Sequence, residues 1–341
     1  MKKVYLVSRT VLLMLVVVLF LSVLSIREEP KAQPLHDSNL TNSVLEKLNS
    51  QQSGISIAEK KILYDKDDNI FAFAYSLLPE GYAIVSHTGE FLEVSFEGPS
   101  PYLGIENQSY YFGYLNYFKR SGKELIHCFT DDIITNSELS SGSYSTHIPS
   151  NQLSGINYVL PGTPARLTAI SSKACTVTGI AILLNYHHRY FTGNFYPVGV
   201  TTATGLRDYL INNKFVFGNG GLYLSSAITT HIKNSVSYKG LRSFLSSVPN
   251  VTNKVLYLGS YSLSNTINVI HGEGRPILID INTSALNPEK TSRHVVFAYG
   301  LGYDAQLSPA QFIIVNDGWG NNNVWVNSSM LNGTETLKMQ K

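Results

Sequence analysis

Apolar residues follow two different periods along the first third of the chain. In residues 38–51 they recur at the spacing of helical turns, which predicts a short amphipathic helix. Short apolar runs then follow, separated by turn residues such as Gly and Pro, and they predict an antiparallel meander. These strands are expected at residues 70–77, 82–86 and 91–96. Residues 110–120 are rich in aromatic side chains and are predicted to be helical.

The rest of the chain contains a group of helix-like segments and then a group of strand-like segments. Helices are predicted from residue 175 onwards and at residues 202–213, 222–233 and 262–272. Strands are predicted at residues 276–281, 294–300, 312–316 and 324–327. Helices that precede the strands, rather than alternating with them, indicate the α+β class with segregated parts.

Cys175 lies in the first turn of the helix that begins near residue 175. Ser171 and Ser172 precede the apolar stripe of this helix, at positions where N-capping residues are common. Unpaired backbone N–H groups and the helix dipole favour an anion in the first turn, so we expect a lowered thiol pKa and a nucleophilic thiolate. A buried structural cysteine fits the same pattern equally well. The helix alone therefore leaves both interpretations open.

The first residues have the pattern of a secretory signal. Lys2, Lys3 and Arg9 precede an apolar run at residues 10–26, and a charged segment follows it. We expect export, with residues 1–26 as a signal peptide. The run is about as long as the shortest membrane spans, so a retained anchor is the alternative to cleavage.

Charge divides the chain into an acidic front half (residues 27–150) and a basic back half (residues 151–341). The front half contains 9 Lys and Arg against 17 Asp and Glu, whereas the back half contains 14 against 7. Opposite charges favour attraction between the halves, as in a pro-segment that restrains an enzyme. Residues 130–155 are polar and Ser-rich, which predicts a linker that proteases can cleave. The expected domains are therefore residues 27–129 and 156–341.

Cysteine, histidine and glycine positions argue against several other kinds of site. The chain contains only two cysteines, Cys128 and Cys175, so it is not a disulfide scaffold, although these two could pair. His187 and His188 are adjacent and point to different faces of a helix, and no Cys or His cluster has zinc-ligand spacing. Basic residues are scattered and no phosphate-binding glycine loop is present. We therefore expect no metal, no cofactor and no nucleic-acid partner.

Two further segments contain candidate catalytic side chains. His294 begins an apolar strand, and the strand at residues 312–316 ends in an Asn-Asp-Gly-Trp-Gly turn at residues 316–320. A carbonyl or carboxylate in that turn can accept a hydrogen bond from the imidazole and fix its tautomer, and Trp319 can shield this bond from water. Taken singly, a structural histidine and an ordinary Asn-Asp-Gly turn explain the same residues.

In combination, the cysteine helix, the histidine strand and the turn resemble papain-like cysteine peptidases. The resemblance is to the streptopain and bacteriocin-leader-peptidase-like branch found in bacteria. In the front half, the Gly-Tyr-Ala-Ile-Val-Ser strand at residues 81–86 resembles the streptopain-type prodomain. The resemblance implies an α+β peptidase domain, with a helical part and an antiparallel β part, preceded by a small α+β prodomain.

The resemblance also implies roles for individual residues. Cys175 would be the nucleophile, His294 its base and later its acid, and Asp317 the third member, with Asn316 as the alternative and Trp319 in support. The implied protein is the secreted zymogen of an endopeptidase that cleaves a protein or peptide substrate. Its own prodomain would be an intramolecular inhibitor, and it would be secreted or held at the bacterial cell surface, reaching the membrane only through an uncleaved signal.

One departure from the papain pattern concerns the oxyanion hole. Papain has a glutamine a few residues before the nucleophile, whereas residues 158–174 contain none. The Cys175 backbone N–H remains as one donor, and Gln152 could fold back, or Ser171 or Ser172 could substitute. Loss of one donor costs on the order of a hundredfold in rate. The alternatives are therefore a weakened or inactive papain-fold binding protein at the cell surface, or a transferase or amidase with the same triad.

Overall fold

The structure, a computed structural model, describes most of the front half and the central strands and helices of the back half. Its described residues are 37–129, 131, 133–135, 157–168, 175–191, 195–212, 256–282, 293–304, 307–331 and 333–339. The predicted signal peptide, most of the predicted linker and the predicted helix at 222–233 lie outside these ranges. No helix within the described ranges is long and apolar enough to cross a membrane.

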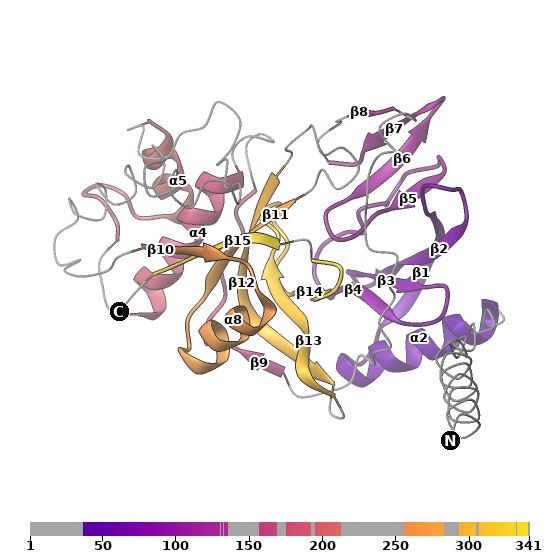
Figure 1. Cartoon of the computed structure of the whole chain (residues 1–341), viewed down its shortest axis with the longest axis horizontal. Helices are drawn as coiled ribbons and strands as arrows, with labels where there is room; N and C mark the ends of the chain where they lie inside the picture. Colours follow the sequence, from indigo (N-terminus) through magenta and orange to yellow (C-terminus); the bar gives the residue numbers. More distant parts are fainter. Residues whose placement is uncertain are drawn as a thin grey trace, which may run out of the picture. The chain divides into compact units, whose positions relative to one another are not determined.

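The front half begins with the predicted helix and meander, which are confirmed. Helix α2 (Asp37–Gln51) buries its apolar stripe, and in both views it lies beside β4 (Figure 1). The strands are β1 (Ser56–Tyr64), β2 (Ile70–Leu78), β3 (Tyr82–Ser86) and β4 (Phe91–Ser95). The sequence pattern missed β1 because this strand is largely half-buried or exposed and contains Glu59, Lys60 and Lys61 among its apolar residues.

The predicted helix at residues 110–120 is wrong. This segment instead forms strands on either side of a turn, and further short strands follow. They are β5 (Ser109–Tyr111), β6 (Tyr117–Ser121), β7 (Glu124–His127) and β8 (Ile133–Ile134). Gly113 and Leu115 have positive φ angles of 107° and 65° in the turn. A helix cannot accommodate these angles, and aromatic side chains fit well on a pleated sheet.

The back half has the predicted helices and the predicted later strands, but the predicted order of helices and then strands holds only in part, because one strand precedes the first helix and another lies between the second and third. Its helices are α4 (Cys175–Tyr190), α5 (Ala203–Asn212) and α8 (Leu263–Ile267), and α8 continues into a π-helical turn, η2 (Asn268–Gly272). The predicted strands are β11 (Ile277–Asn282), β12 (Arg293–Asp304), β13 (Leu307–Asn316) and β14 (Val324–Asn327). Three strands were not predicted, namely β9 (Asn157–Val159), β10 (Leu256–Ser260) and β15 (Gly333–Met339).

One sheet runs through both halves. Its order is β10-β15-β11-β12-β13-β14-β4-β3-β2-β1-β5-β6-β7-β8, and β9 pairs with β12. Neighbouring strands are antiparallel except for β1 and β5. The halves meet where β14 pairs with β4, with Trp325 opposite Val94 (Figure 1). The chain is therefore a mixed helix and sheet protein, with a mainly antiparallel sheet and with helices that lie beside this sheet.

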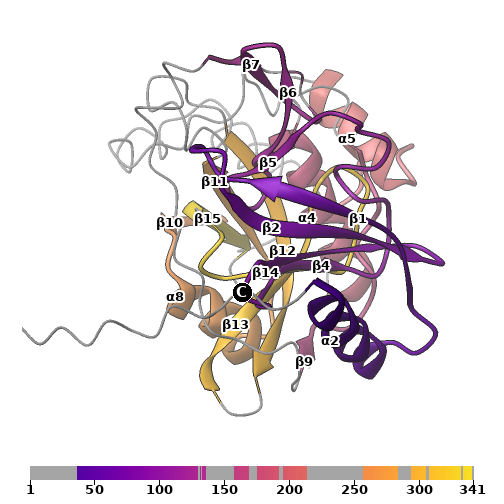
Figure 2. The same cartoon turned by 90° about the vertical axis from the view of Figure 1, so that its right-hand side faces the viewer.

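Helix α4 packs against β11 and β12, and this contact places the cysteine. A methyl group built on Gly179 would lie 3.0 Å from Val295 Cγ1 and 3.4 Å from Leu278 Cδ2, so the glycine permits a close approach. Further along α4, the ring centroid of Tyr186 lies 5.3 Å from that of Phe297 on β12. In the second view the ribbon of α4 lies behind that of β12 (Figure 2). The helix is held on a rigid sheet, and its first residue is Cys175.

Candidate active site

Cys175 is the first residue of α4, as the helix prediction requires. Its side chain is 3% exposed, and its thiol interacts with the Val295 backbone and with Thr176. Val295 directly follows His294 on β12. The structure thus places the thiol of Cys175, the predicted nucleophile, against Val295, which is the sequence neighbour of the predicted base His294.

The expected lowering of the Cys175 pKa is wrong for this structure. Burial raises the pKa of the thiol, and the nearby Asp280 carboxylate raises it further, although hydrogen bonds from Val295 and Thr176 partly oppose the change. The helix terminus contributes about 1 kcal/mol in favour of an anion, and the loss of hydration of a buried thiolate costs more. Cys175 is therefore held as a neutral thiol.

His294 is also buried and neutral. Its ring packs against Trp319, with centroids 4.2 Å apart, and its Nε2 atom lies 2.5 Å from the backbone oxygen of Asp317. A carbonyl oxygen only accepts, so Nε2 donates its proton and Nδ1 has the lone pair. Burial lowers the pKa of His294 to about 4, an effect to which the nearby His127 adds and which the bond to Asp317 opposes. This tautomer makes Nδ1 the nitrogen that can remove a proton.

Asp317 lies beside His294 as predicted, but its carboxylate holds the turn. Oδ1 accepts hydrogen bonds from the backbone of Trp319 at 2.7 Å and of Asn321 at 3.0 Å. Oδ2 accepts from Asn321 Nδ2 at 2.6 Å. Burial raises the pKa of this carboxyl to about 6, and the three hydrogen bonds limit the rise. Contact with the imidazole is made by the backbone carbonyl of Asp317, whereas the side chain shapes the turn that presents it.

Gly318 allows the turn to approach His294. Its φ angle is +72°, and a Cβ atom added there would lie 3.3 Å from His294 Nε2. A side chain at this position would be strained by the backbone and would crowd the hydrogen bond to Asp317. The glycine of the Asn-Asp-Gly-Trp-Gly turn is thus required at the point where the turn meets the histidine.

Asn316, the alternative third member, has its side chain engaged elsewhere. Its Oδ1 accepts from the Gly318 backbone N–H at 2.9 Å. Its Nδ2 donates to Asn322 Oδ1 and to the backbone oxygen of Ala165, the latter at 3.3 Å. These bonds connect the turn with the segment that precedes α4 in the sequence.

A segment of the front half covers this site. The ring of Phe129 packs on Trp319 at 4.6 Å between centroids, and Trp319 in turn covers His294. His127 is held by a hydrogen bond from its Nε2 to the Leu115 carbonyl at 2.8 Å, and its Nδ1 accepts from the Phe129 backbone N–H at 3.2 Å. The end of β7 therefore shields the imidazole from solvent.

Sequence reasoning missed two buried carboxylates near the site. Asp280, 2% exposed, lies opposite Val295 in the β11–β12 pairing and acts electrostatically on Cys175. As the one acidic residue of an apolar strand, it could have been noticed. Glu93 on β4 is fully buried and accepts hydrogen bonds from the hydroxyls of Tyr82, Tyr111 and Tyr117. Its partners come from three strands, so no local pattern could have indicated them.

The other predicted residues lie outside the described ranges. Gln152, Ser171 and Ser172, the candidates for completing the oxyanion hole, are among them. The Cys175 backbone lies at the start of α4, where helical N–H groups lack intrahelical partners. Within the described part of the chain, no group of three or more His, Cys, Asp or Glu side chains could hold a metal ion.

Comparison with known proteins gives only distant similarities. No protein-family model matches the sequence, and no curated protein matches it. A Bacillus anthracis structure described as a C39-like peptidase is similar at 11% identity and a TM-score of 0.33, over 54% of this chain and 98% of that one. A fragment of prointerpain A from Prevotella intermedia is similar at 12% identity and a TM-score of 0.36, over 82% and 97%. At these TM-scores neither similarity defines the fold, and the site is interpreted from its own geometry.

Proposed function

We propose that this chain is the exported precursor of a papain-like cysteine peptidase, in which Cys175 and His294 hydrolyse peptide bonds by acyl transfer. The observation that carries the proposal is the hydrogen bond from His294 Nε2 to the Asp317 carbonyl. This bond orients the imidazole so that Nδ1 is its basic nitrogen. Val295, the next residue on the same strand, contacts the Cys175 thiol. A cysteine nucleophile requires a base that is itself oriented by a third group.

The proposed reaction begins when Nδ1 of His294 removes the Cys175 proton. The thiolate attacks the substrate carbonyl, and the Cys175 backbone N–H stabilises the oxyanion. The imidazolium then donates its proton to the leaving amine, and water hydrolyses the thioester with His294 as base again. Throughout, the Asp317 carbonyl accepts from Nε2 and favours the imidazolium, so the turn contributes to each step.

In the proposed precursor, the front half keeps this site inactive. Both reacting groups are neutral and buried, and Phe129 covers Trp319 above the imidazole. Cleavage within the predicted linker, followed by displacement of the front half, would hydrate the site. Hydration would reverse the main cause of both pKa changes, and a thiolate–imidazolium pair could then form.

Processing of the purified chain tests this function. The full chain is incubated with reductant, with and without iodoacetamide, and the new N-terminus and casein cleavage are measured. We expect a new N-terminus between residues 130 and 155 and casein cleavage, both blocked by iodoacetamide and by Cys175→Ala. The matched control Cys128→Ala, which removes the other thiol, should process normally.

The binding-protein alternative makes the opposite prediction for this experiment. A chain with no catalytic role for Cys175 would show no self-processing and no casein cleavage, and its thiol would react with iodoacetamide no faster than an ordinary free thiol. Absence of cleavage by the parent chain, or cleavage that persists in the Cys175→Ala chain, would contradict the peptidase function.

A further inference from the structure

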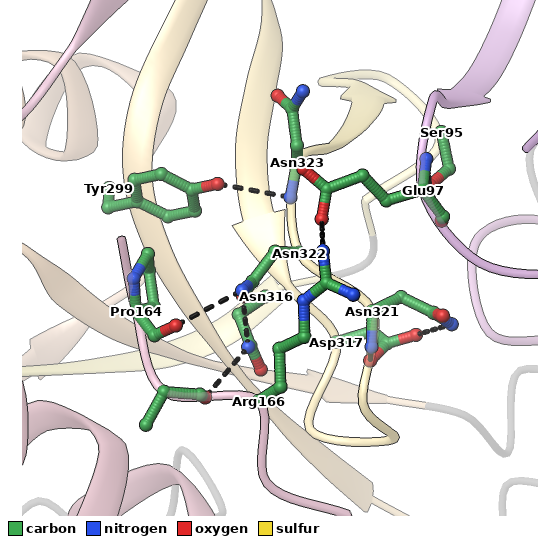
Figure 3. A network of polar contacts seen from close by, with 11 residues as sticks. Ser95, Glu97, Pro164, Arg166, Tyr299, Asn316, Asp317, Asn321, Asn322 and Asn323 are labelled. Atoms are coloured by element: carbon green, nitrogen blue, oxygen red, sulfur yellow. Dashed lines mark hydrogen bonds and ion pairs between the residues drawn. The ribbon is translucent and has the colours of Figure 1, made fainter. Parts of the chain in front are cut away.

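Two buried asparagines connect the turn at residues 316–320 with the chain that leads into α4. Asn316 and Asn322 are 0% and 1% exposed. Asn316 Nδ2 donates to Asn322 Oδ1 and to the Ala165 carbonyl, and Asn322 Nδ2 donates to the Pro164 carbonyl at 3.1 Å (Figure 3). Because both amides donate and accept away from water, each lost bond would leave a buried polar group unpaired.

The same pair also reaches the acceptor of His294. Asn316 Oδ1 accepts from the Gly318 backbone N–H at 2.9 Å, and this bond helps to hold the turn that presents the Asp317 carbonyl to the imidazole. One side of Asn316 therefore supports the base, and its other side holds the segment upstream of the nucleophile.

Further contacts hold the end of that upstream segment. Thr168 forms a β-bridge with Trp319, and its carbonyl accepts from Arg207 Nη1 at 2.9 Å. Added to the bonds at Pro164 and Ala165, these contacts attach residues 164–168 to the turn and to α5. Cys175 follows Thr168 by seven positions, so the attached segment lies close to the predicted nucleophile along the sequence.

We propose that Asn316 and Asn322 are positioning residues for the reaction. They hold residues 164–168 against the turn, so that the chain leading to Cys175 and the acceptor of His294 keep a fixed relation. This inference rests on the proposed peptidase function. Neither amide contacts substrate in this role. Asn316 joins the turn to the segment at residues 164–168 and does not bind the imidazole.

Asn322→Asp keeps the hydrogen bond between the two side chains and removes the one to Pro164. The carboxylate keeps an acceptor for Asn316 Nδ2 and has no N–H for the Pro164 carbonyl. Asn322→Ala, which introduces no charge, serves as the second variant. Asn185→Ala is the matched control, because Asn185 is also buried in the back half and its amide joins α4 to Tyr196 and not to the turn.

Three measurements test the proposal. The first is hydrolysis, by the self-processed chain, of a peptide copied from its mapped cleavage site. We expect both Asn322 variants to lower kcat about tenfold or more, with KM within about twofold, because mispositioning of reacting groups reduces rate more than binding. The second is the iodoacetamide reaction of the Cys175 thiol in the processed chain, which we expect to slow and to shift its pH profile in both Asn322 variants, because thiolate formation needs His294 in a fixed relation to Cys175.

The third measurement is amide hydrogen exchange in the unprocessed full chain. We expect faster exchange in residues 163–168 of the Asn322 variants, and no change there in Asn185→Ala. Unchanged exchange, unchanged kcat, or an unchanged pH profile of thiol alkylation would each overturn the proposal. If the wild-type chain does not hydrolyse the peptide, the peptidase function fails, and the exchange measurement alone decides whether the asparagine pair holds the segment.

Discussion

At the residue scale, Asp317 has two separate tasks. Its backbone carbonyl accepts from His294, whereas its carboxylate accepts from the Trp319 and Asn321 N–H groups of the turn. The resemblance to papain-like peptidases predicted that Asp317 is the third catalytic residue. The structure assigns the contact with the imidazole to the main chain, so the charge of the side chain should matter little for orientation of the base.

Asp317→Asn tests this division. Asparagine keeps the backbone carbonyl and an Oδ1 acceptor for the Trp319 and Asn321 N–H groups, and it loses the negative charge and the Oδ2 acceptor of Asn321 Nδ2. We expect the processed chain to retain peptide hydrolysis within about tenfold, whereas a carboxylate that orients a catalytic histidine costs about 10⁴-fold when it becomes an amide. Asp317→Ala, which removes the acceptors of the turn, should lose far more. A 10⁴-fold loss in Asp317→Asn would show that the carboxylate itself is the partner of His294.

At the scale of the elements, the end of β7 covers the site of the back half. Phe129 follows this strand and packs on Trp319, and His127 fixes the Phe129 backbone through its Nδ1 atom. The ring of Phe129 is itself 43% exposed. Only one partly exposed ring therefore covers Trp319 here, and removal of the Phe129 ring should expose Trp319 and His294 without disrupting the core.

Phe129→Ala tests the cover in the unprocessed chain. With the ring removed, water reaches His294 and Cys175 more easily, and we expect iodoacetamide to label Cys175 about tenfold faster, because thiolate formation is less penalised. The measurement is made in a Cys128→Ala background, so that only one thiol reacts. Ile62→Ala, which truncates an exposed apolar residue on β1, is the control. Equal labelling rates in the two variants would mean that Phe129 does not shield the site.

At the scale of the whole described molecule, the two halves share one sheet and one apolar core. The β14–β4 pairing joins them, and Glu93 lies in β4 opposite Val326. The ion pair between Arg166 and Glu97 also links the halves and is partly exposed (Figure 3). Cleavage of the linker alone should therefore leave the halves bound, because the main-chain pairing and the buried residues remain.

Glu93 makes the stability of this junction depend on pH. Burial raises its pKa from 4.5 to about 7, and the nearby Asp317 contributes, although three tyrosine hydroxyls oppose the rise. Between these values the folded chain binds a proton that the unfolded chain has lost. The resulting stabilisation is complete below pH 4.5 and is lost as pH rises through about 7.

Glu93→Gln should remove this contribution. In a Cys175→Ala background, which prevents self-cleavage, urea midpoints are measured at pH about 5 and about 8. We expect the variant to gain stability relative to the parent chain at the higher pH. His294, whose pKa is lowered, is present in both chains and cancels in this comparison, whereas Asp317 interacts with Glu93, so its titration forms part of the measured difference. Glu90→Gln is the control, and a relative midpoint that does not change with pH would contradict the role of Glu93.

Local periodicity predicted some of the regular elements and missed β1, β9, β10 and β15. Helices α2, α4 and α5 and the strands β2, β3 and β4 were predicted because their apolar residues recur with a helical or strand period. The aromatic run at residues 110–120 was misassigned because aromatic residues fit either element, and a turn with positive φ angles decided the outcome. The charge division between the halves predicted their association, but backbone pairing and apolar packing form most of the junction.

By itself, the sequence determined where Cys175, His294 and the turn at residues 316–320 fall on their elements. Helix and strand periods are properties of neighbouring residues, and the order of the three segments is simply read along the chain. Only the tertiary structure decided that Cys175 is neutral, that the Asp317 carbonyl and not its carboxylate meets His294, and that Asn316 reaches the segment before α4. These features depend on burial and on hydrogen-bond partners from distant parts of the chain, which no local pattern contains.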